Sequence, residues 1–375
     1  MSFGSDPYFH DQHRALEEKV RAFGDRHLRA WSDDEARPEE RTREIARQLG
    51  QVGILASAVA PPHGSMDLRS LVAVREALAY YSGLADTAFA MQGLGAQAVS
   101  LAGTDVQKNR WLPEVVRGNI LCAFAVTEPE AGSDLAAVRT RAVRVEGGWR
   151  VNGSKLWTTI ANHAHIMIAM VRTSGDADAR HEGLSQLLLD LSTPGVTVRP
   201  IVDMVGERHF NEVFFEDVFV PETRLVGREG EGWRQAAAEL ALERSGPERY
   251  LSCHQLFVEL LAAAGDAPPE DIRILLGNLA ADLWTIRQMS LAMAGALAQG
   301  KEPALEAAIV KDLGAQFEQE LPRLVQAAMQ PQLEVANPQL RPVMEYLLQT
   351  SNSFSLRGGT REILRGIVAR GLGLR

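Results

Sequence analysis

Cysteine is scarce in this chain, which has only Cys122 and Cys253 among its 375 residues. Two cysteines cannot build a disulfide framework, so we expect a reducing compartment, the cytoplasm. Basic residues are also in the minority, because 39 Lys and Arg stand against 48 Asp and Glu and leave a net charge of -9. Since nucleic-acid affinity depends mainly on Lys and Arg, this balance argues against a nucleic-acid partner.

Long apolar runs are missing as well. No run reaches the roughly 18 to 20 residues that span a bilayer. The N-terminal stretch "MSFGSDPYFHDQHRALEEKV" has neither the basic start nor the continuous apolar core of a secretion signal. We therefore expect no membrane partner, and we expect no metal site either.

The hydrophobic periodicity changes twice along the chain. Residues 11–117 place apolar side chains at three- and four-residue spacing, which predicts helices. Residues 119–226 contain short β-branched or alternating segments such as "WRVNGSKLW" and "HIMIAMVRT", which predict strands. Helical spacing returns from residue 230 onward. This order excludes a βαβ nucleotide fold and predicts an α+β protein. The predicted domains are an N-terminal α-helical domain (1–118), a middle β domain (119–227) and a C-terminal α-helical domain (228–375).

The segment "FAVTEPEAGSD", from Phe124 to Asp134, combines an apolar strand with a turn rich in Pro, Gly, Ser and Asp. Such a turn leaves hydroxyls and backbone N–H groups available to a polar ligand. Without a ligand, the segment is only a strand that ends in a turn.

The segment "NGSKLWTT", from Asn152 to Thr159, offers a second candidate site. Its Asn-Gly pair predicts a hairpin turn. The following Trp157 and Thr159 supply an aromatic wall and a hydroxyl for a planar ring system. A single Trp in a strand is more often a core residue, so both interpretations stay open.

These two segments, together with "FNEVFFEDVFVPETRLVGREGEGW" (210–233) and "GGTREILRGIVARGLG" (358–373), resemble the acyl-CoA dehydrogenases. These FAD-dependent flavoproteins form an α,β-double bond in acyl-CoA thioesters. The resemblance covers essentially the whole chain and implies a middle β-barrel or sandwich and a C-terminal four-helix bundle. It also implies a role in fatty-acid β-oxidation, an electron-transfer flavoprotein as partner, and a homotetramer or dimer.

The resemblance also implies which residues bind the cofactor and the substrate. Thr127 would bind the pyrimidine edge of the flavin, Trp157 would stack on the flavin, and Thr159 would lie near its N5 atom. The implied FAD contacts are Phe124, Val126, Thr127, Trp157, Thr159, Thr360 and Glu362. The implied acyl-CoA contacts are Ser133, Arg244, Gly358 and Gly359.

The stretch "FSLRGGTREIL" lacks the catalytic base that most of the family carries there. Removal of a proton α to a thioester needs a positioned base and donors that polarise the carbonyl. The family's usual glutamate precedes Gly-Thr in this loop, where this chain has Gly358. A minority of the family places it on a C-terminal helix before an arginine, and the matching residues are Glu243 and Arg244. The Gly358 N–H would still bind the thioester carbonyl.

A helical projection at about 100° per residue tests this assignment. It places Glu243 and Arg244 on the flanks of an apolar stripe, whereas Glu239 and Glu248 point elsewhere. A carboxylate beside such a stripe needs either a function or a salt bridge. Catalysis by Glu243 and a structural pair of Glu239 or Glu243 with an arginine both remain open. The residues of the stripe are Trp233, Ala236, Ala237, Leu240 and Pro247.

Two segments depart from the family pattern. In the family, a motif with an Arg and a Phe before a Gly reaches the FAD of a neighbouring subunit, and a later motif with a Gln and a Gly-Gly pair does likewise. The first motif does not survive in residues 260–283, and the second does not survive in residues 340–359. A heterotetramer with a related chain is therefore an alternative, with this chain as a catalytically weak subunit. A flavin oxidase or monooxygenase on the same fold is another. The position of the glutamate suggests branched, long or bulky acyl groups.

Overall fold

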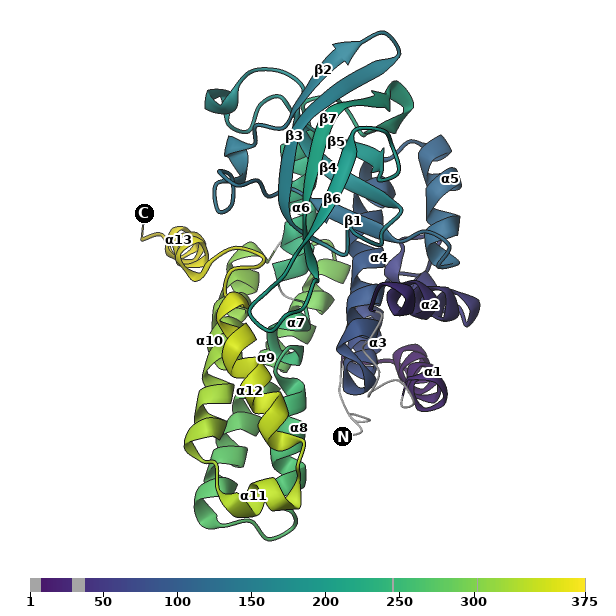
Figure 1. Cartoon of the computed structure of the whole chain (residues 1–375). Coiled ribbons are helices and arrows are strands. Elements are labelled where there is room, and N and C mark those ends of the chain that lie inside the picture. Colours follow the sequence, from purple (N-terminus) through teal and green to yellow (C-terminus); the bar gives the residue numbers. More distant parts are fainter. Residues whose placement is uncertain (1–7, 29–37, 245, 302, 375) are drawn as a thin grey trace. The chain divides into compact units, whose positions relative to one another are not determined.

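The structure, a computed structural model, describes residues 8–28, 38–244, 246–301 and 303–374, and it gives no side-chain placement for residues 177, 238 and 240–244. The chain divides into two compact units (Figure 1). One comprises Ala15–Glu239, and the other comprises Met1–Arg14 with Leu240–Arg375. The predicted order of helices, strands and helices is confirmed.

The N-terminal helices owe their starts to side chains that accept hydrogen bonds from free backbone N–H groups. Asp67 caps α3, Ser82 caps α4, and Thr104 forms a reciprocal capping box with Gln107 at the start of α5. The apolar faces of the first four helices share a core that includes Leu49, Leu78 and Phe89. The buried residues of the fifth helix, such as Leu112, pack in another cluster. The helices are α1 (Asp11–His27), α2 (Pro38–Gln51), α3 (Leu68–Tyr81), α4 (Gly83–Ala102) and α5 (Asp105–Val116).

The middle strands are hydrogen-bonded into one eight-stranded sheet in the order β6-β7-β3-β2-β4-β5-β8, with β1 parallel to β4. The central strands β4 and β5 are buried along nearly their whole length, although β5 carries the polar residues Ser185 and Gln186. The strands are β1 (Cys122–Ala125), β2 (Arg141–Val145), β3 (Gly148–Thr159), β4 (Ile166–Arg172), β5 (Leu184–Asp190), β6 (Val196–Ile201), β7 (Phe210–Pro221) and β8 (Leu225–Val226).

The hairpin turn predicted at Asn152-Gly153 is wrong, because these residues lie inside β3. The register between β3 and β7 shifts between Val151 and Gly153, so the pair marks a bulge. Gly153 has φ +142° there, and a Cβ atom would lie 2.7 Å from the Cα of Thr140. The glycine is needed for close approach between chain segments rather than for a turn.

The C-terminal helices are packed around one apolar core. Helices α8, α9, α10 and α12 contribute buried residues to it, including Leu260, Leu279, Leu321 and Leu347. Figure 1 shows α9, α10 and α12 side by side in this unit. The helices are α6 (Gly232–Arg244), α7 (Glu248–Leu251), α8 (His254–Ala264), α9 (Glu270–Ala298), α10 (Ala304–Ala327), α11 (Pro331–Ala336), α12 (Leu340–Thr350) and α13 (Arg361–Gly371). No helix among the described residues has both the length and the apolar character to cross a membrane.

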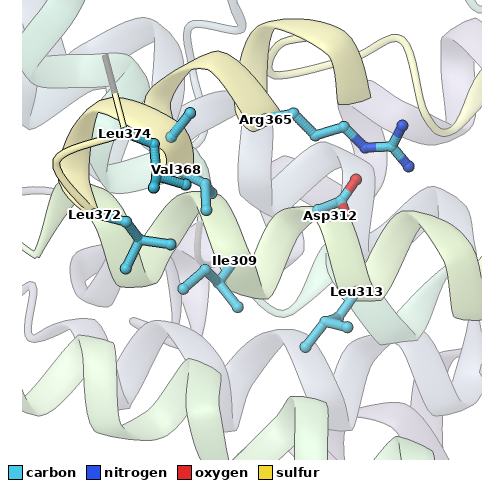
Figure 2. Close-up of a pocket in the computed structure, with 8 residues that line it drawn as sticks. Ile309, Asp312, Leu313, Arg365, Val368, Leu372 and Leu374 are labelled. Atoms are coloured by element: carbon cyan, nitrogen blue, oxygen red, sulfur yellow. The ribbon is translucent and has the colours of Figure 1, made fainter.

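Helix α13 lies on α10. Its buried residue is Leu364, and Arg361 pairs with Asp312 of α10 at 2.7 Å. Further along, the two helices form the walls of a groove with apolar side chains such as Ile309, Leu313 and Val368 (Figure 2). The start of α13, directly after the two glycines, is therefore fixed to α10 by an ion pair.

Candidate active site

The turn after β1 is organised by a buried carboxylate, Glu128, which is 4% exposed. It accepts hydrogen bonds from the backbone N–H groups of Arg139 at 2.6 Å and Thr140 at 3.0 Å. It also pairs with the Nζ atom of Lys155 at 2.7 Å, and the Lys155 side chain is fully buried. The pair therefore ties the "TEPEAGSD" turn to β3, the strand that carries Trp157 and Thr159.

The geometry of the Glu128–Lys155 pair favours its ionised form. Burial lowers the pKa of Lys155, but the charge and hydrogen bond of Glu128 oppose this shift. Burial alone would raise the pKa of Glu128, but the charge and hydrogen bond of Lys155, with the bonds from Thr140 and Arg139, outweigh it and hold the pKa below its usual value. Glu128 is thus a structural anion rather than a proton acceptor. Sequence reasoning missed this pair, although both residues stand inside the two quoted motifs.

Trp157 lies outside the core. Its side chain is 54% exposed, and its φ of +58° is a left-handed position that a bulky residue rarely adopts. The register of β3 on β7 shifts between Lys155 and Thr158, so this strained backbone belongs to a bulge. The ring meets Phe210 edge-on at 5.9 Å between centroids. The core interpretation of Trp157 is therefore wrong, and the backbone presents an indole ring to the outside.

The other predicted residues of this unit lie close to Trp157 along the chain or through hydrogen bonds. The backbone N–H of Leu156 donates to the carbonyl of Thr127 at 2.9 Å, which brings the end of the first motif against the second. Phe124, Val126, Thr127 and Thr159 are half-buried, whereas Ser133 is exposed. An exposed indole beside partly accessible hydroxyls and turn amides fits a planar aromatic cofactor with a polar edge, such as a flavin.

The backbone of the C-terminal loop suits its two glycines. Gly358 has φ +66° and Gly359 has φ +99°, both in the region that favours glycine. Thr360 then caps α13, and its side chain accepts from the Ile363 N–H at 3.5 Å. Glu362 is exposed in the first turn of that helix. A residue with a side chain would be strained at position 358 in this backbone conformation.

Glu243 and Arg244 belong to the last turn of α6, and their side chains lie outside the described residues. The buried face of α6 differs from the predicted stripe, since Ala237 is exposed and Trp233 is only half-buried. Gly232 brings the helix against the backbone of Ser185 in β5, where a Cβ atom would have no space. The face that this contact buries comprises Gly232, Gln235, Ala236 and Glu239.

Glu239 is therefore buried, and the prediction that it points elsewhere is wrong. Its carboxylate is 2% exposed and accepts from the Nε2 atom of Gln186 on β5 at 3.2 Å. Among the described residues its hydrogen-bond partner is this amide, not an arginine. Burial raises the pKa of Glu239 to about 7, although the bond from Gln186 opposes the shift.

This burial makes stability depend on pH. The folded protein keeps a proton on Glu239 that the unfolded chain, with the ordinary value of 4.5, has already released. The free energy of unfolding should therefore fall as pH rises from 4.5 to about 7. Glu239→Gln keeps the shape of the neutral carboxyl, so we expect it to raise that free energy by about 2 to 3 kcal/mol at pH 8 and little at pH 4.5.

Urea unfolding at the two pH values measures the effect. Glu306→Gln, on the exposed first turn of α10, is the matched control and should change neither value appreciably. An equal gain at both pH values for Glu239→Gln would contradict the assignment of the raised pKa.

The chain is similar in sequence to known proteins along most of its length. Residues 10–119 match the family model "Acyl-CoA dehydrogenase, N-terminal domain", and residues 123–218 match "Acyl-CoA dehydrogenase, middle domain". The chain is 35% identical over 292 residues to the acyl-CoA dehydrogenase IpdE1 of Mycolicibacterium smegmatis, with 72% of each chain covered.

Two further proteins show the extent of the similarity. The chain is 34% identical over 286 residues to the acyl-CoA dehydrogenase FadE34 of Mycobacterium tuberculosis, which covers 72% of this chain but 37% of that protein. The solved structure of butyryl-CoA dehydrogenase from Megasphaera elsdenii superposes with a TM-score of 0.84 at 22% identity, covering 99% and 100% of the two chains. That likeness shows the shared fold.

Proposed function

The chain belongs to the acyl-CoA dehydrogenase family, whose cofactor is FAD, and on this premise we propose that it oxidises an acyl-CoA thioester to the α,β-unsaturated product. FAD, when bound, accepts the hydride that leaves the β-carbon. The observation that carries the proposal is the exposed Trp157 ring, which a strained bulge holds outside the core. Strained backbone conformations of this kind concentrate at active sites and ligand-binding sites.

We propose that the residues of both motifs and of the C-terminal loop hold the cofactor. The exposure of Trp157 and the half-buried positions of Thr127 and Thr159 support this assignment. A ring stacks on the indole, and the hydroxyls bind polar atoms at its edge. The proposed contacts are Phe124, Val126, Thr127, Trp157, Thr159, Thr360 and Glu362.

The proton chemistry belongs to the chain's own residues. Glu243 takes the α-proton of the substrate, and its place on α6 directly before Arg244 supports this role. The backbone N–H of Gly358 donates to the thioester carbonyl and stabilises the enolate charge that develops there. The left-handed conformation of Gly358 and Gly359 supports an open approach to this donor. Ser133, Arg244 and Gly359 contact the rest of the acyl-CoA.

The proposal extends to partners. Members of the family bind acyl-CoA and associate with an electron-transfer flavoprotein, which we propose as the electron acceptor of this chain. We propose a homotetramer or dimer in the cytoplasm acting in fatty-acid β-oxidation, with a related chain as the alternative partner. The missing Arg/Phe and Gln/Gly-Gly segments favour that alternative.

Purified protein tests the function. A yellow protein whose flavin absorbance is bleached without oxygen by one member of a panel of straight, branched and bulky acyl-CoAs would support it. We expect bleaching to be fastest with a branched, long or bulky acyl group. A colourless chain that takes up FAD only with a related chain would favour the heteromeric alternative. Hydrogen peroxide formed in air at the rate of substrate oxidation would favour a flavin oxidase.

A further inference from the structure

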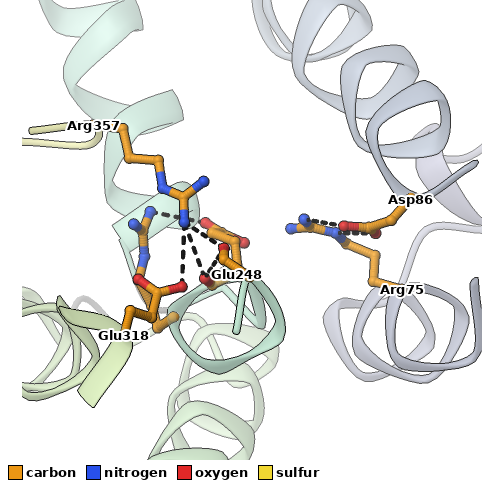
Figure 3. Close-up of polar contacts among 7 residues, drawn as sticks. Arg75, Asp86, Glu248, Glu318 and Arg357 are labelled. Carbon is orange, nitrogen blue, oxygen red and sulfur yellow. Dashed lines mark hydrogen bonds and ion pairs between the residues drawn. The ribbon is translucent and has the colours of Figure 1, made fainter. Parts of the chain in front are cut away.

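The residue directly before the two glycines of the C-terminal loop, Arg357, is bound to the interior of the helical bundle (Figure 3). Its Nη2 atom lies 3.2 Å from Oε1 of Glu318, a fully buried carboxylate on α10. The same nitrogen donates to the hydroxyl of Ser252, the residue after α7, and lies 3.5 Å from the backbone carbonyl of Glu248. One guanidinium thus connects the loop to two helices.

The surroundings of Glu318 make this connection rigid. Cys253 donates from its Sγ atom to the backbone carbonyl of Glu318 at 3.1 Å. Helix α7 approaches α10 at Gly314, where a Cβ atom would lie 2.6 Å from the carbonyl oxygen of Arg249. The guanidinium of Arg357 also lies over the Phe354 ring at 4.5 Å. The Arg357 side chain is 39% exposed, but its charged end meets two helices that are packed closely against each other.

The loop is held on its other side as well. Arg361 pairs with Asp312 of α10 at 2.7 Å, so ion pairs to a single helix flank the glycines on both sides. Two adjacent glycines in left-handed conformations have many alternative states in a free loop. A backbone donor that stabilises an oxyanion needs a fixed position, since small displacements weaken it strongly.

We propose that Arg357 and its buried partner Glu318 are positioning residues, which fix the Gly358 N–H where it donates to the thioester carbonyl. This inference rests on the proposed function and adds two residues that the family pattern does not assign. Arg357 acts through the loop backbone, and Glu318 acts through Arg357. Helix α7 is the next helix after Arg244 in the chain, and the same guanidinium contacts its first residue and the residue that follows it.

Two measurements on the holoenzyme test the positioning role with Arg357→Gln. Hydrogen exchange in peptides covering residues 354–364 should become at least about tenfold faster than in the parent, because the loop opens more often. Infrared spectra of a bound 2-enoyl-CoA, labelled with ¹³C at its carbonyl and matched to the best substrate, should show a smaller red shift of the carbonyl stretch. Arg357→Lys should recover only part of both effects, since an ammonium group cannot stack as a planar guanidinium does over the Phe354 ring.

A second variant and a control complete the design. Glu318→Gln replaces the buried carboxyl group by an amide of nearly the same shape and should reproduce both effects if Arg357→Gln does not fold. Arg323→Gln loses only an exposed contact of α10 to Asn352 and should match the parent in both measurements. If the Arg357 and Glu318 variants showed the same hydrogen-exchange rates and the same carbonyl red shift as the parent, the inference would be overturned. A parent that binds no enoyl-CoA would instead overturn the proposed function, while exchange still tests whether Arg357 fixes the loop.

Discussion

Glu243→Gln is expected to slow flavin reduction by acyl-CoA at least about 100-fold, with FAD content and acyl-CoA affinity close to those of the parent. The amide has nearly the shape of the carboxylate but cannot accept the α-proton. Since the substitution changes one side-chain oxygen to an amide nitrogen, loss of reduction reports on proton transfer. Anaerobic stopped-flow absorbance of the flavin measures the rate, and titration with the enoyl-CoA product measures the affinity.

The closest control is on the same helix. Glu239 stands one helical turn before Glu243, but it is buried and bonded to Gln186 of β5, so Glu239→Gln should reduce flavin at nearly the parental rate. Loss of reduction in Glu239→Gln, with an unaffected Glu243→Gln, would transfer the role of base to Glu239. Parental reduction in both variants would mean that neither carboxylate is the base.

The order of helices and strands could be predicted from the sequence, because hydrophobic period is a local property of the chain. The meaning of single residues within an element was harder to predict. The Asn152-Gly153 pair has the composition of a hairpin turn, yet Gly153 is required by the nearby Thr140, a residue that local sequence does not reveal. The glycine is therefore required because β3 passes close to Thr140, not because the chain turns there.

The orientation of α6 shows a second limit. A helical projection gives the spacing of apolar residues but not the direction of the surface they meet. Because Gly232 packs against Ser185, the buried face of α6 includes Glu239, although the side chain of Glu239 is polar. Buried acidic residues such as Glu239 and Glu318 contradict the rule that ionisable side chains lie outside, and such violations concentrate at functional or strained sites.

Pairs of charges between distant segments were the third limit. Glu128 and Lys155 are 27 residues apart, and Glu318 and Arg357 are 39 residues apart. Each residue was visible in the sequence, but only the fold brings the partners together. The candidate site residues of the two motifs were recognised by resemblance, whereas the ion pairs that hold those motifs in place required the structure.

Lys155→Met is expected to lower the free energy of unfolding by about 3 to 5 kcal/mol at neutral pH. The methionine fills most of the space of the lysine stem, but Glu128 keeps a buried charge without its cation. The loss should be smaller at acidic pH, because burial then raises the pKa of Glu128 and protonation removes the charge. Urea unfolding of the parent and the variant across this pH range measures both the size and the direction.

The double variant Glu128→Gln/Lys155→Met distinguishes the loss of the ion pair from the cost of one buried charge left without its partner. With neither charge buried, much of the lost stability should return, because replacing both partners of a buried pair is far less damaging than removing one. The pair also holds the turn after β1 against β3, where Leu156 bonds to Thr127 next to Trp157. We therefore expect FAD affinity to fall in Lys155→Met and to recover in the double variant only as far as stability does. If Lys155→Met were as stable as the parent at neutral pH, Lys155 would not neutralise Glu128. The assignment of an ionised pair would then be wrong.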